Sequence, residues 1–207
     1  MTPTEFARAF DVSRETCARL EAYIALLTRW NARINLVAPA TIDTAWARHV
    51  ADSAQLFDLA PARASSWIDL GSGAGLPGLV VAALAAETAP SLHVTLVESD
   101  TRKAAFVAAA AREMGLDVSV EPRRIETLAP QPYDIVSARA LAPLTRLCAL
   151  AHPFSAKGTV FLFPKGAGVD SELTAARARW HIQGEQIASR TNPEATVLRI
   201  LELEPRS

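Results

Sequence analysis

The spacing of apolar side chains divides the chain into two parts, and the first part is helical. Between residues 20 and 34 the apolar positions recur at intervals of three and four, as on one face of an α-helix. An earlier helix is expected to begin at Pro3, because Thr2 and Glu5 stand at the positions of a capping box. A third helix is expected over residues 44–57. We therefore predict a helical segment over residues 1–62.

Beyond that segment the pattern changes, and short apolar runs alternate with helical stretches. The expected strands cover residues 66–70, 92–98, 118–121, 133–137, 159–163, 182–189 and 196–204. The expected helices cover residues 76–87, 101–115, 143–152 and about 170–180. Alternation of strands and helices predicts a doubly wound parallel sheet. The last two strands have only residues 190–195 between them, too few for a helical crossover, so they should pair antiparallel.

A glycine-rich segment follows the first expected strand and reads D-L-G-S-G-A-G-L-P-G over residues 69–78. Its glycines lack a Cβ, so a ligand can approach the backbone closely. Pro77 suits the start of the next helix, whose free N–H groups and dipole suit an anion such as a cofactor carboxylate. Glu98 closes the second strand, where an acidic residue binds ribose hydroxyls. These features predict a nucleoside cofactor at the carboxyl ends of the strands.

The same glycines also match the dinucleotide fingerprint, as Gly73-x-Gly75-x-x-Gly78, and glycines can simply form a turn. Three features favour S-adenosylmethionine instead. Asp69 precedes the first glycine by two residues, the sheet is expected to end in an antiparallel hairpin, and the chain leaves no room for a dehydrogenase catalytic domain. We predict an α/β, Rossmann-like methyltransferase fold of seven strands over residues 63–207, packed as one unit with the helical segment.

Composition narrows the setting of the protein. The net charge is −1, with 21 basic and 22 acidic residues, so a nucleic-acid partner would have to meet a local basic patch. No apolar run reaches the roughly 18 residues needed to cross a bilayer, and no signal peptide is recognisable at the N-terminus. The cysteines, Cys17 and Cys148, have no metal-ligand spacing. We expect a cytoplasmic monomer that binds neither a membrane nor a metal ion.

Further motifs accompany the glycine loop along the chain. They are W-N-x-x-I-N-L at residues 30–36, R-H-V-x-D-S at 48–53, V-E-S-D-x-R-K at 97–103, R-R-I-E at 123–126, S-A-R-A at 137–140 and P-K-G at 164–166. In this combination the chain resembles the bacterial 16S ribosomal RNA (guanine-N7) methyltransferase G family, also called the glucose-inhibited division protein B family. The resemblance covers nearly the whole chain.

The resemblance implies cofactor contacts, which join those expected from the loop and the strand ends. The cofactor-binding residues expected are Gly71, Ser72, Gly73, Gly75, Leu76, Glu98, Ile125, Glu126 and Arg139. It also implies the partner, 16S ribosomal RNA in the 30S subunit. Basic residues follow several strand ends at the same rim of the sheet, and we expect them to contact phosphates. The RNA-binding residues expected are His49, Arg102, Lys103, Arg123, Arg124 and Lys165.

Other interpretations stay open at this stage. The rim charges could be scattered and solvated, and His49 could belong to a helix-face network with an Arg48–Asp52 pair.

The loop A-L-A-P-L over residues 140–144 lacks the N/D-P-P-Y/F motif of many exocyclic-amine methyltransferases. Guanine N7 carries no proton, so we expect catalysis by positioning, without an acid or base. The alternatives are a small-molecule or protein methyltransferase and a non-enzymatic ribosome-assembly factor.

Overall fold

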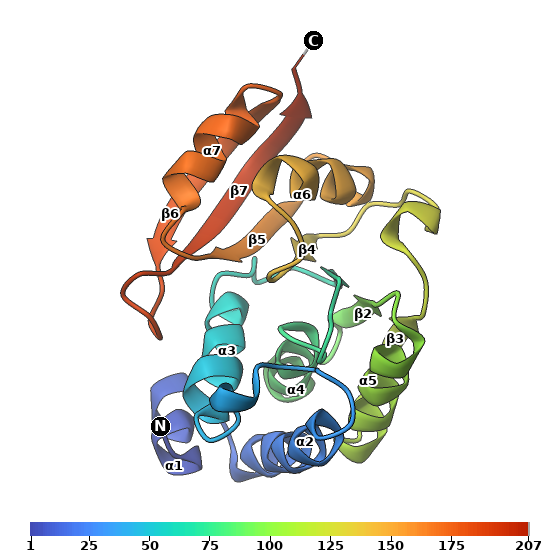
Figure 1. Cartoon of the computed structure of the whole chain (residues 1–207), viewed down its shortest axis with the longest axis vertical. Helices are drawn as coiled ribbons and strands as arrows, with labels where there is room; N and C mark the ends of the chain where they lie inside the picture. Colours follow the sequence, from blue (N-terminus) through green and yellow to red (C-terminus); the bar gives the residue numbers. More distant parts are fainter. Residues whose placement is uncertain (207) are drawn as a thin grey trace.

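The computed structural model describes residues 1–206, and one seven-stranded sheet runs through the middle of the molecule (Figure 1). The strand order is β3-β2-β1-β4-β5-β7-β6. The strands are β1 (Ser66–Leu70), β2 (His93–Val97), β3 (Val118–Glu121), β4 (Ile135–Ser137), β5 (Val160–Lys165), β6 (Trp180–Ala188) and β7 (Thr196–Pro205). The first five are parallel, whereas β7 is antiparallel to both β5 and β6. The predicted parallel sheet with a terminal hairpin is confirmed.

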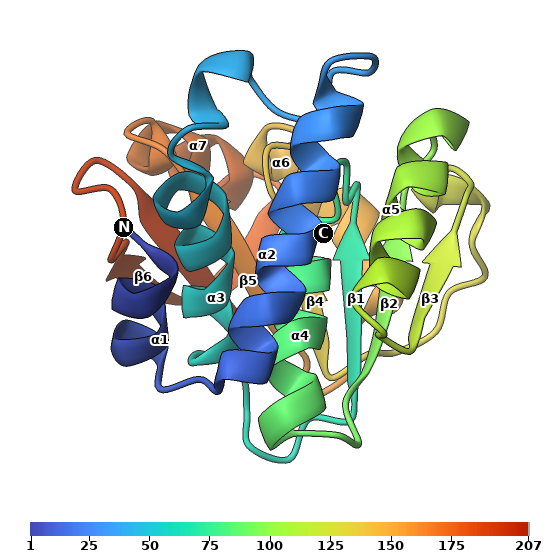
Figure 2. The same cartoon turned by 90° about the horizontal axis from the view of Figure 1, so that it is seen from below.

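Helices cover both faces of the sheet. The α-helices are α1 (Pro3–Phe10), α2 (Arg14–Asn31), α3 (Asp52–Phe57), α4 (Gly78–Thr88), α5 (Thr101–Glu113), α6 (Leu144–Ala151) and α7 (Val169–Arg177). The short helices are η1 (Pro39–Thr41), η2 (Trp46–Ala51), η3 (Ile125–Thr127) and η4 (His152–Phe154). Helices α6 and α7 lie on one face, and α4 and α5 lie on the other (Figure 1). Helix α2 packs across the outside of α4 and α5 (Figure 2).

Local hydrogen bonds explain where several helices begin and end. The Thr2 N–H donates to Glu5 Oε2 at 2.7 Å and the Glu5 N–H to Thr2 Oγ1 at 3.2 Å, which is the predicted capping box of α1. Asp100 is the N-cap of α5, since its Oδ1 accepts the N–H of Arg102 at 2.8 Å and that of Lys103 at 3.3 Å. Gly115 follows the end of α5 with φ at +62°, a conformation that glycine adopts without a Cβ clash.

Two predicted helices have different boundaries in the structure. The helix expected from residue 76 begins at Gly78, because Leu76 and Pro77 still belong to the glycine-rich turn. The helix expected over residues 44–57 is divided into the π-helical turn η2 and the α-helix α3. A π-helical turn bonds residues five apart and therefore changes which side chains share a face.

Each face of the sheet has its own apolar cluster. The cluster under α4 and α5 includes Trp67 of β1 and Phe106 of α5, together with Leu20 and Tyr23 from the N-terminal helices. The other cluster lies between the sheet and the pair α6 and α7. The N-terminal helical segment therefore contributes to the same core as the sheet that it covers. Among residues 1–206, none of the helices is long and apolar enough to cross a membrane.

Candidate functional site

The glycine loop turns sharply at the carboxyl end of β1, and two of its glycines are needed for different reasons. Gly71 has φ at +69°, and a Cβ on it would lie 2.5 Å from Leu141 Cδ1, so no other residue fits without a shift. A Cβ on Gly73 would meet only the Gly71 carbonyl oxygen, at 3.9 Å. The backbone at Gly73 is therefore open to the cleft above it, where a ligand can come close.

Asp69 lies beneath this loop and accepts a hydrogen bond at the start of α4, where a cofactor anion was expected. Its Oδ2 accepts the N–H of Gly78 at 3.2 Å, and its Oδ1 accepts the Ser137 hydroxyl at 2.8 Å. The Trp67 indole donates to the same hydroxyl at 2.8 Å. The Leu79 N–H bonds within the loop as well. The prediction of free N–H groups at the start of α4 is therefore wrong, because the anion at this end of the helix is the side chain of Asp69.

Complete burial raises the pKa of Asp69 to about 6, although hydrogen bonds from Ser137 and Gly78 oppose the rise. The side chain has no exposed surface, so it supports the loop and does not contact a ligand in the cleft.

Glu98 lies just past β2 and connects two parts of the cleft wall. Its Oε2 accepts the N–H of Gly73 and its Oε1 accepts the N–H of Asp100, both at 2.8 Å. Each carboxylate oxygen can accept a second hydrogen bond. The two backbone bonds orient the carboxylate at the edge of the cleft, in the position expected for an acceptor of ribose hydroxyls.

The first cleft, of about 460 Å³, opens above the glycine loop. Of the nine cofactor-binding residues predicted, it is lined by Gly71, Ser72, Gly73, Leu76, Glu98, Ile125, Glu126 and Arg139. Gly75 does not line it and serves the turn, with φ at +79°. Leu36, from the segment between α2 and η1, also lines the cleft and was not predicted. Carboxylates, an apolar Ile125 and open glycine backbone together suit a nucleoside with a charged tail.

A second cleft, of about 880 Å³, adjoins the first. The two clefts share Leu36 and residues 139–142, which we call the shared wall. The remainder of the second cleft comes from distant parts of the chain, including Asp52, Lys165 and Glu172. A ligand in one cleft therefore lies next to a ligand in the other, as two reactants must.

Arg139, in the shared wall, is paired with Asp52. The distance between Arg139 Nη1 and Asp52 Oδ2 is 3.2 Å, and the two side chains are 20% and 19% exposed. Asp52 Oδ1 also accepts the hydroxyl of Thr191 at 2.9 Å and the amide of Gln55 at 3.0 Å. Within residues 1–206 the alternative pair between Arg48 and Asp52 is not formed, because the π-helical turn and the rest of the fold direct Asp52 to Arg139 and leave Arg48 exposed.

His49 lines the second cleft but is buried, with 7% of its surface exposed. The Thr41 hydroxyl has one proton and donates it to the Ala38 carbonyl at 2.7 Å. The contact of 2.7 Å between Thr41 Oγ1 and His49 Nε2 therefore places the imidazole proton on Nε2. Burial and the charge of Arg139 lower the pKa of His49 to about 4. His49 is neutral at pH 7 and joins η1 to η2. Its contact with RNA stays a prediction, and it would be made by a neutral imidazole in the second cleft.

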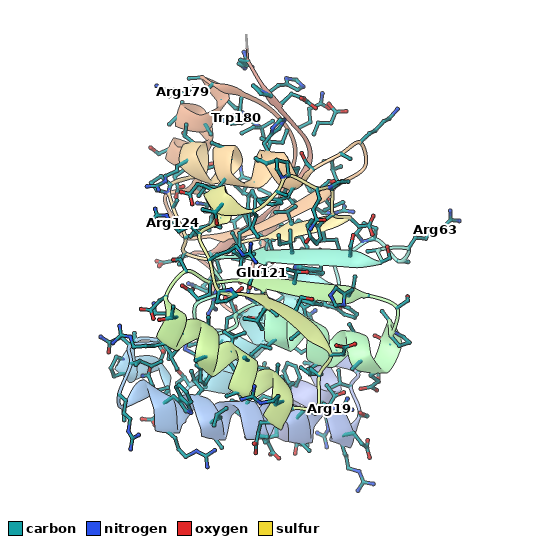
Figure 3. All side chains as sticks on the ribbon, turned by 90° about the vertical axis from the view of Figure 1, so that its right-hand side faces the viewer. Arg19, Arg63, Glu121, Arg124, Arg179 and Trp180 are labelled. Atoms are coloured by element: carbon teal, nitrogen blue, oxygen red, sulfur yellow. The ribbon has the colours of Figure 1, made fainter. Side chains whose placement is uncertain are left out.

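The remaining basic residues lie at the rim, but most have acidic neighbours. The Arg123–Glu121 distance is 2.8 Å and the Arg102–Asp100 distance is 3.2 Å. Arg124 lies 3.8 Å from Glu126 and projects at the carboxyl-end edge of the sheet, opposite the edge at which Arg63 projects (Figure 3). These pairs are exposed, and exposed pairs are weak, so the guanidinium groups can still exchange partners.

The two lysines of the predicted patch differ in their surroundings. Lys103 lines the first cleft and has no ion pair in the part of the chain that the structure describes. Lys165 is 10% exposed, and its ammonium donates to Glu172 Oε2 at 2.8 Å and to the Ala142 carbonyl at 3.2 Å. Lys103 is therefore free for a phosphate, whereas Lys165 is already engaged.

The N-terminal helices position the site, and sequence reasoning did not foresee how. The Tyr23 hydroxyl donates to the Ala74 carbonyl in the glycine loop at 2.8 Å. The Asn31 side chain accepts the N–H groups of Leu36 and Val37, at 2.9 and 3.0 Å, and so shapes the segment that brings Leu36 to the shared wall. The W-N-x-x-I-N-L motif was the available signal, since a polar residue after an apolar helix often caps a loop.

Known proteins are similar to this chain along most of its length. The family model GidB, described as rRNA small subunit methyltransferase G, matches residues 16–196. The ribosomal RNA small subunit methyltransferase G of Cereibacter sphaeroides is 50% identical over 194 residues, which cover 94% of this chain and 93% of the relative. The protein of the same name from Jannaschia sp. is 52% identical over 188 residues, 91% of this chain and 89% of the relative.

Solved structures show the same fold at low sequence identity. The ribosomal protein L11 methylase of Lactobacillus delbrueckii subsp. bulgaricus superposes with a TM-score of 0.58 and 14% identity, covering 75% of this chain and 77% of the other. A TehB-like SAM-dependent methyltransferase from Corynebacterium glutamicum gives a TM-score of 0.55 and 14% identity, covering 73% and 87%.

Proposed function

This chain belongs to the rRNA small subunit methyltransferase G family, and we propose that it methylates N7 of a guanine in 16S ribosomal RNA, with S-adenosylmethionine as the methyl donor. The observation that carries the proposal is the pair of adjoining clefts that share one wall, the first of which lies above the glycine loop. Two adjoining clefts suit a cofactor and a base that react with each other. The 30S subunit is the proposed substrate, and the cytoplasm is the proposed location.

The residues of the first cleft fit the methyl donor. The backbone at Gly73 is open, and Glu98 has acceptor capacity for two ribose hydroxyls. Ile125 offers an apolar surface to the adenine, and Arg139, which belongs to the shared wall, can contact the methionine carboxylate. When bound, S-adenosylmethionine supplies a methyl group on a positively charged sulfur. The carboxylate of Glu98 complements that charge.

The protein's part in the reaction is positioning. Guanine N7 has an in-plane lone pair and no proton, so no side chain has to remove a proton before attack. The shared wall fixes the angle between the two clefts and can align N7 with the methyl group at about 3 Å, the distance from which displacement proceeds. Asp69 has a raised pKa but is completely buried. His49 is neutral, and its Nε2–H donates to the Thr41 hydroxyl oxygen. Neither is placed to transfer a proton to the base.

The proposed substrate can be tested with labelled S-adenosylmethionine incubated separately with 30S subunits, free 16S RNA and a protein extract. We expect label in the RNA, and nuclease digestion followed by mass spectrometry should identify 7-methylguanosine. Label in the protein fraction alone would reject the proposal. The variant Glu98→Ala should weaken cofactor binding by about tenfold or more in calorimetry, because it removes acceptors of two hydroxyls. The exposed Glu113→Ala, on α5, is the matched control.

The RNA-binding rim can be tested through salt dependence. A lysine that neutralises one phosphate adds about one unit to the slope of log K against log salt. Lys103→Gln should therefore reduce that slope, whereas Lys157→Gln, exposed near the amino end of β5, should not. Equal slopes for all three proteins would show that Lys103 does not contact phosphate.

A further inference from the structure

The proposed reaction dictates which edge of guanine faces which cleft. N7 and O6 lie on one edge of the base, and N7 has to face the cofactor. The opposite edge carries the N1–H and N2–H donors, which then point away from the first cleft and into the second. A side chain that selects guanine at this place must accept hydrogen bonds, and a carboxylate is the strongest acceptor that proteins have.

Two carboxylates line the second cleft, and their hydrogen bonds distinguish them. Both oxygens of Asp52 already accept donors: Oδ1 accepts Thr191 and Gln55, and Oδ2 accepts the guanidinium of Arg139, which also balances the charge of the carboxylate. Glu172 is different, because its Oε2 alone accepts two donors. These are the N–H of Leu144, at 2.7 Å, and the ammonium of Lys165, at 2.8 Å. Within residues 1–206 its Oε1 has no partner, and the side chain is 33% exposed. Glu172 thus offers an unused, oriented acceptor.

Glu172 also lies beside the shared wall. The ammonium of Lys165 bridges it to the carbonyl of Ala142, 3.2 Å away, and Ala142 lines both clefts. Helices α6 and α7, which supply Leu144 and Glu172, lie side by side (Figure 1). We propose that Glu172 accepts the N1–H and N2–H groups of the target guanine in the second cleft and is the specificity-determining residue of the reaction. The inference rests on the proposed function.

This arrangement explains how adenine, which also has an N7, would be rejected. Adenine has an unprotonated N1 and no N2 amino group, so it would set a lone pair against the carboxylate and leave Oε1 of Glu172 unsatisfied. It also gives Lys165 a role other than the phosphate contact that the sequence suggested. Its ammonium fixes the rotamer of Glu172, so that Oε2 stays bonded to Lys165 and Oε1 is left for the guanine.

The variant Glu172→Gln changes the acceptor with little change in volume. Leu144 N–H and Lys165 both donate, so the amide oxygen must take the place of Oε2. The amide NH2 then takes the place of Oε1 and presents donors to the guanine donors. The matched control is Asp170→Asn, a carboxylate-to-amide change on the first turn of the same helix. Asp170 is exposed and does not line the second cleft.

The test uses 30S subunits reconstituted with 16S RNA that carries either guanine or inosine at the nucleotide that the wild-type protein methylates. Inosine keeps N7, O6 and N1–H and lacks only the N2 amino group. We expect the wild-type protein and Asp170→Asn to prefer guanine by roughly tenfold or more in kcat/KM. Glu172→Gln should lose about 10- to 100-fold on guanine and keep a preference below about threefold. Cofactor affinity should stay unchanged, which a misfolded variant would not show.

Two results would overturn the assignment: a wild-type protein that methylates inosine as fast as guanine, or a Glu172→Gln variant that keeps the full preference. Both presuppose that the wild-type protein methylates the guanine subunit. If it does not, the proposed function fails first, and that outcome is read from the wild-type protein alone.

Discussion

Replacement of His49 by glutamine should make the protein less sensitive to acid. An imidazole with an ordinary pKa of 6.5 is held near 4 here, chiefly by burial and then by the charge of Arg139. A histidine whose pKa is lowered in the folded state contributes stability that is fully present above pH 6.5 and is lost as the pH falls to 4. From these two pKa values, protonation of His49 in the unfolded state lowers the free energy of unfolding by about 2 kcal/mol at pH 5 and by about 3 kcal/mol at pH 4, relative to neutral pH.

The assay is urea unfolding of the wild-type protein and His49→Gln at pH 7.5 and pH 5. The glutamine amide can donate to Thr41 as the imidazole does, so the two proteins should differ little at pH 7.5. Between the two pH values the wild-type protein should lose about 2 kcal/mol more than the variant. Asp69 and the other titrating groups are common to both proteins and cancel in the comparison. The exposed His93→Gln controls for loss of an imidazole at the surface. Equal losses in wild-type protein and His49→Gln would refute the burial argument.

Three further substitutions test the supports of the site. Tyr23→Phe leaves the buried carbonyl of the glycine loop without its donor and should cost about 1–3 kcal/mol in thermal unfolding and weaken cofactor binding in calorimetry; unchanged binding would separate the N-terminal helices from the loop. Gly78→Ala sets a Cβ 2.7 Å from Leu96 Cδ2 and should cost about 1–3 kcal/mol by overpacking, measured by urea unfolding; a neutral result would mean that α4 shifts freely. Asp52→Asn removes the charge partner of Arg139 and should lower the free energy of unfolding by about 1–3 kcal/mol. The double variant with Arg139→Gln should lose less free energy of unfolding than the two single variants lose together.

The backbone plan of this protein is readable from its sequence because it depends on local patterns. The capping box at Thr2, the glycine after α5 and the short connection between the last two strands each report on their own neighbourhood. Parallel strands end at the same edge of a sheet, so residues that follow different strands could be placed together in advance. The glycine loop, Glu98 and Ile125 were assigned to one cleft in this way, and they line it.

The ion-pair partners of the charged side chains could not be predicted from the sequence. Asp52 and Arg139 stand 87 positions apart, and nothing in either neighbourhood indicates the other. The alternative pair considered from the sequence, Arg48 with Asp52, assumed a regular α-helix, whereas Arg48 lies in a π-helical turn that ends just before Asp52. Glu172 was missed because it occurs in an ordinary polar first turn of a helix and gains its importance only when α6, β5 and α7 meet. Pattern reasoning finds elements, but ion pairs depend on how elements pack.

The pairing of Arg139 with Asp52 has a consequence for the kinetics of the reaction. Methyl transfer moves a full positive charge from the sulfur in one cleft to the purine in the other, across the wall in which this pair lies. A guanidinium alone would repel the charged product, but the pair as a whole is neutral. The rate constant of a single turnover, measured with both substrates already bound, should therefore vary little with ionic strength. The association rate, which depends on the basic rim, should fall steeply as salt is added.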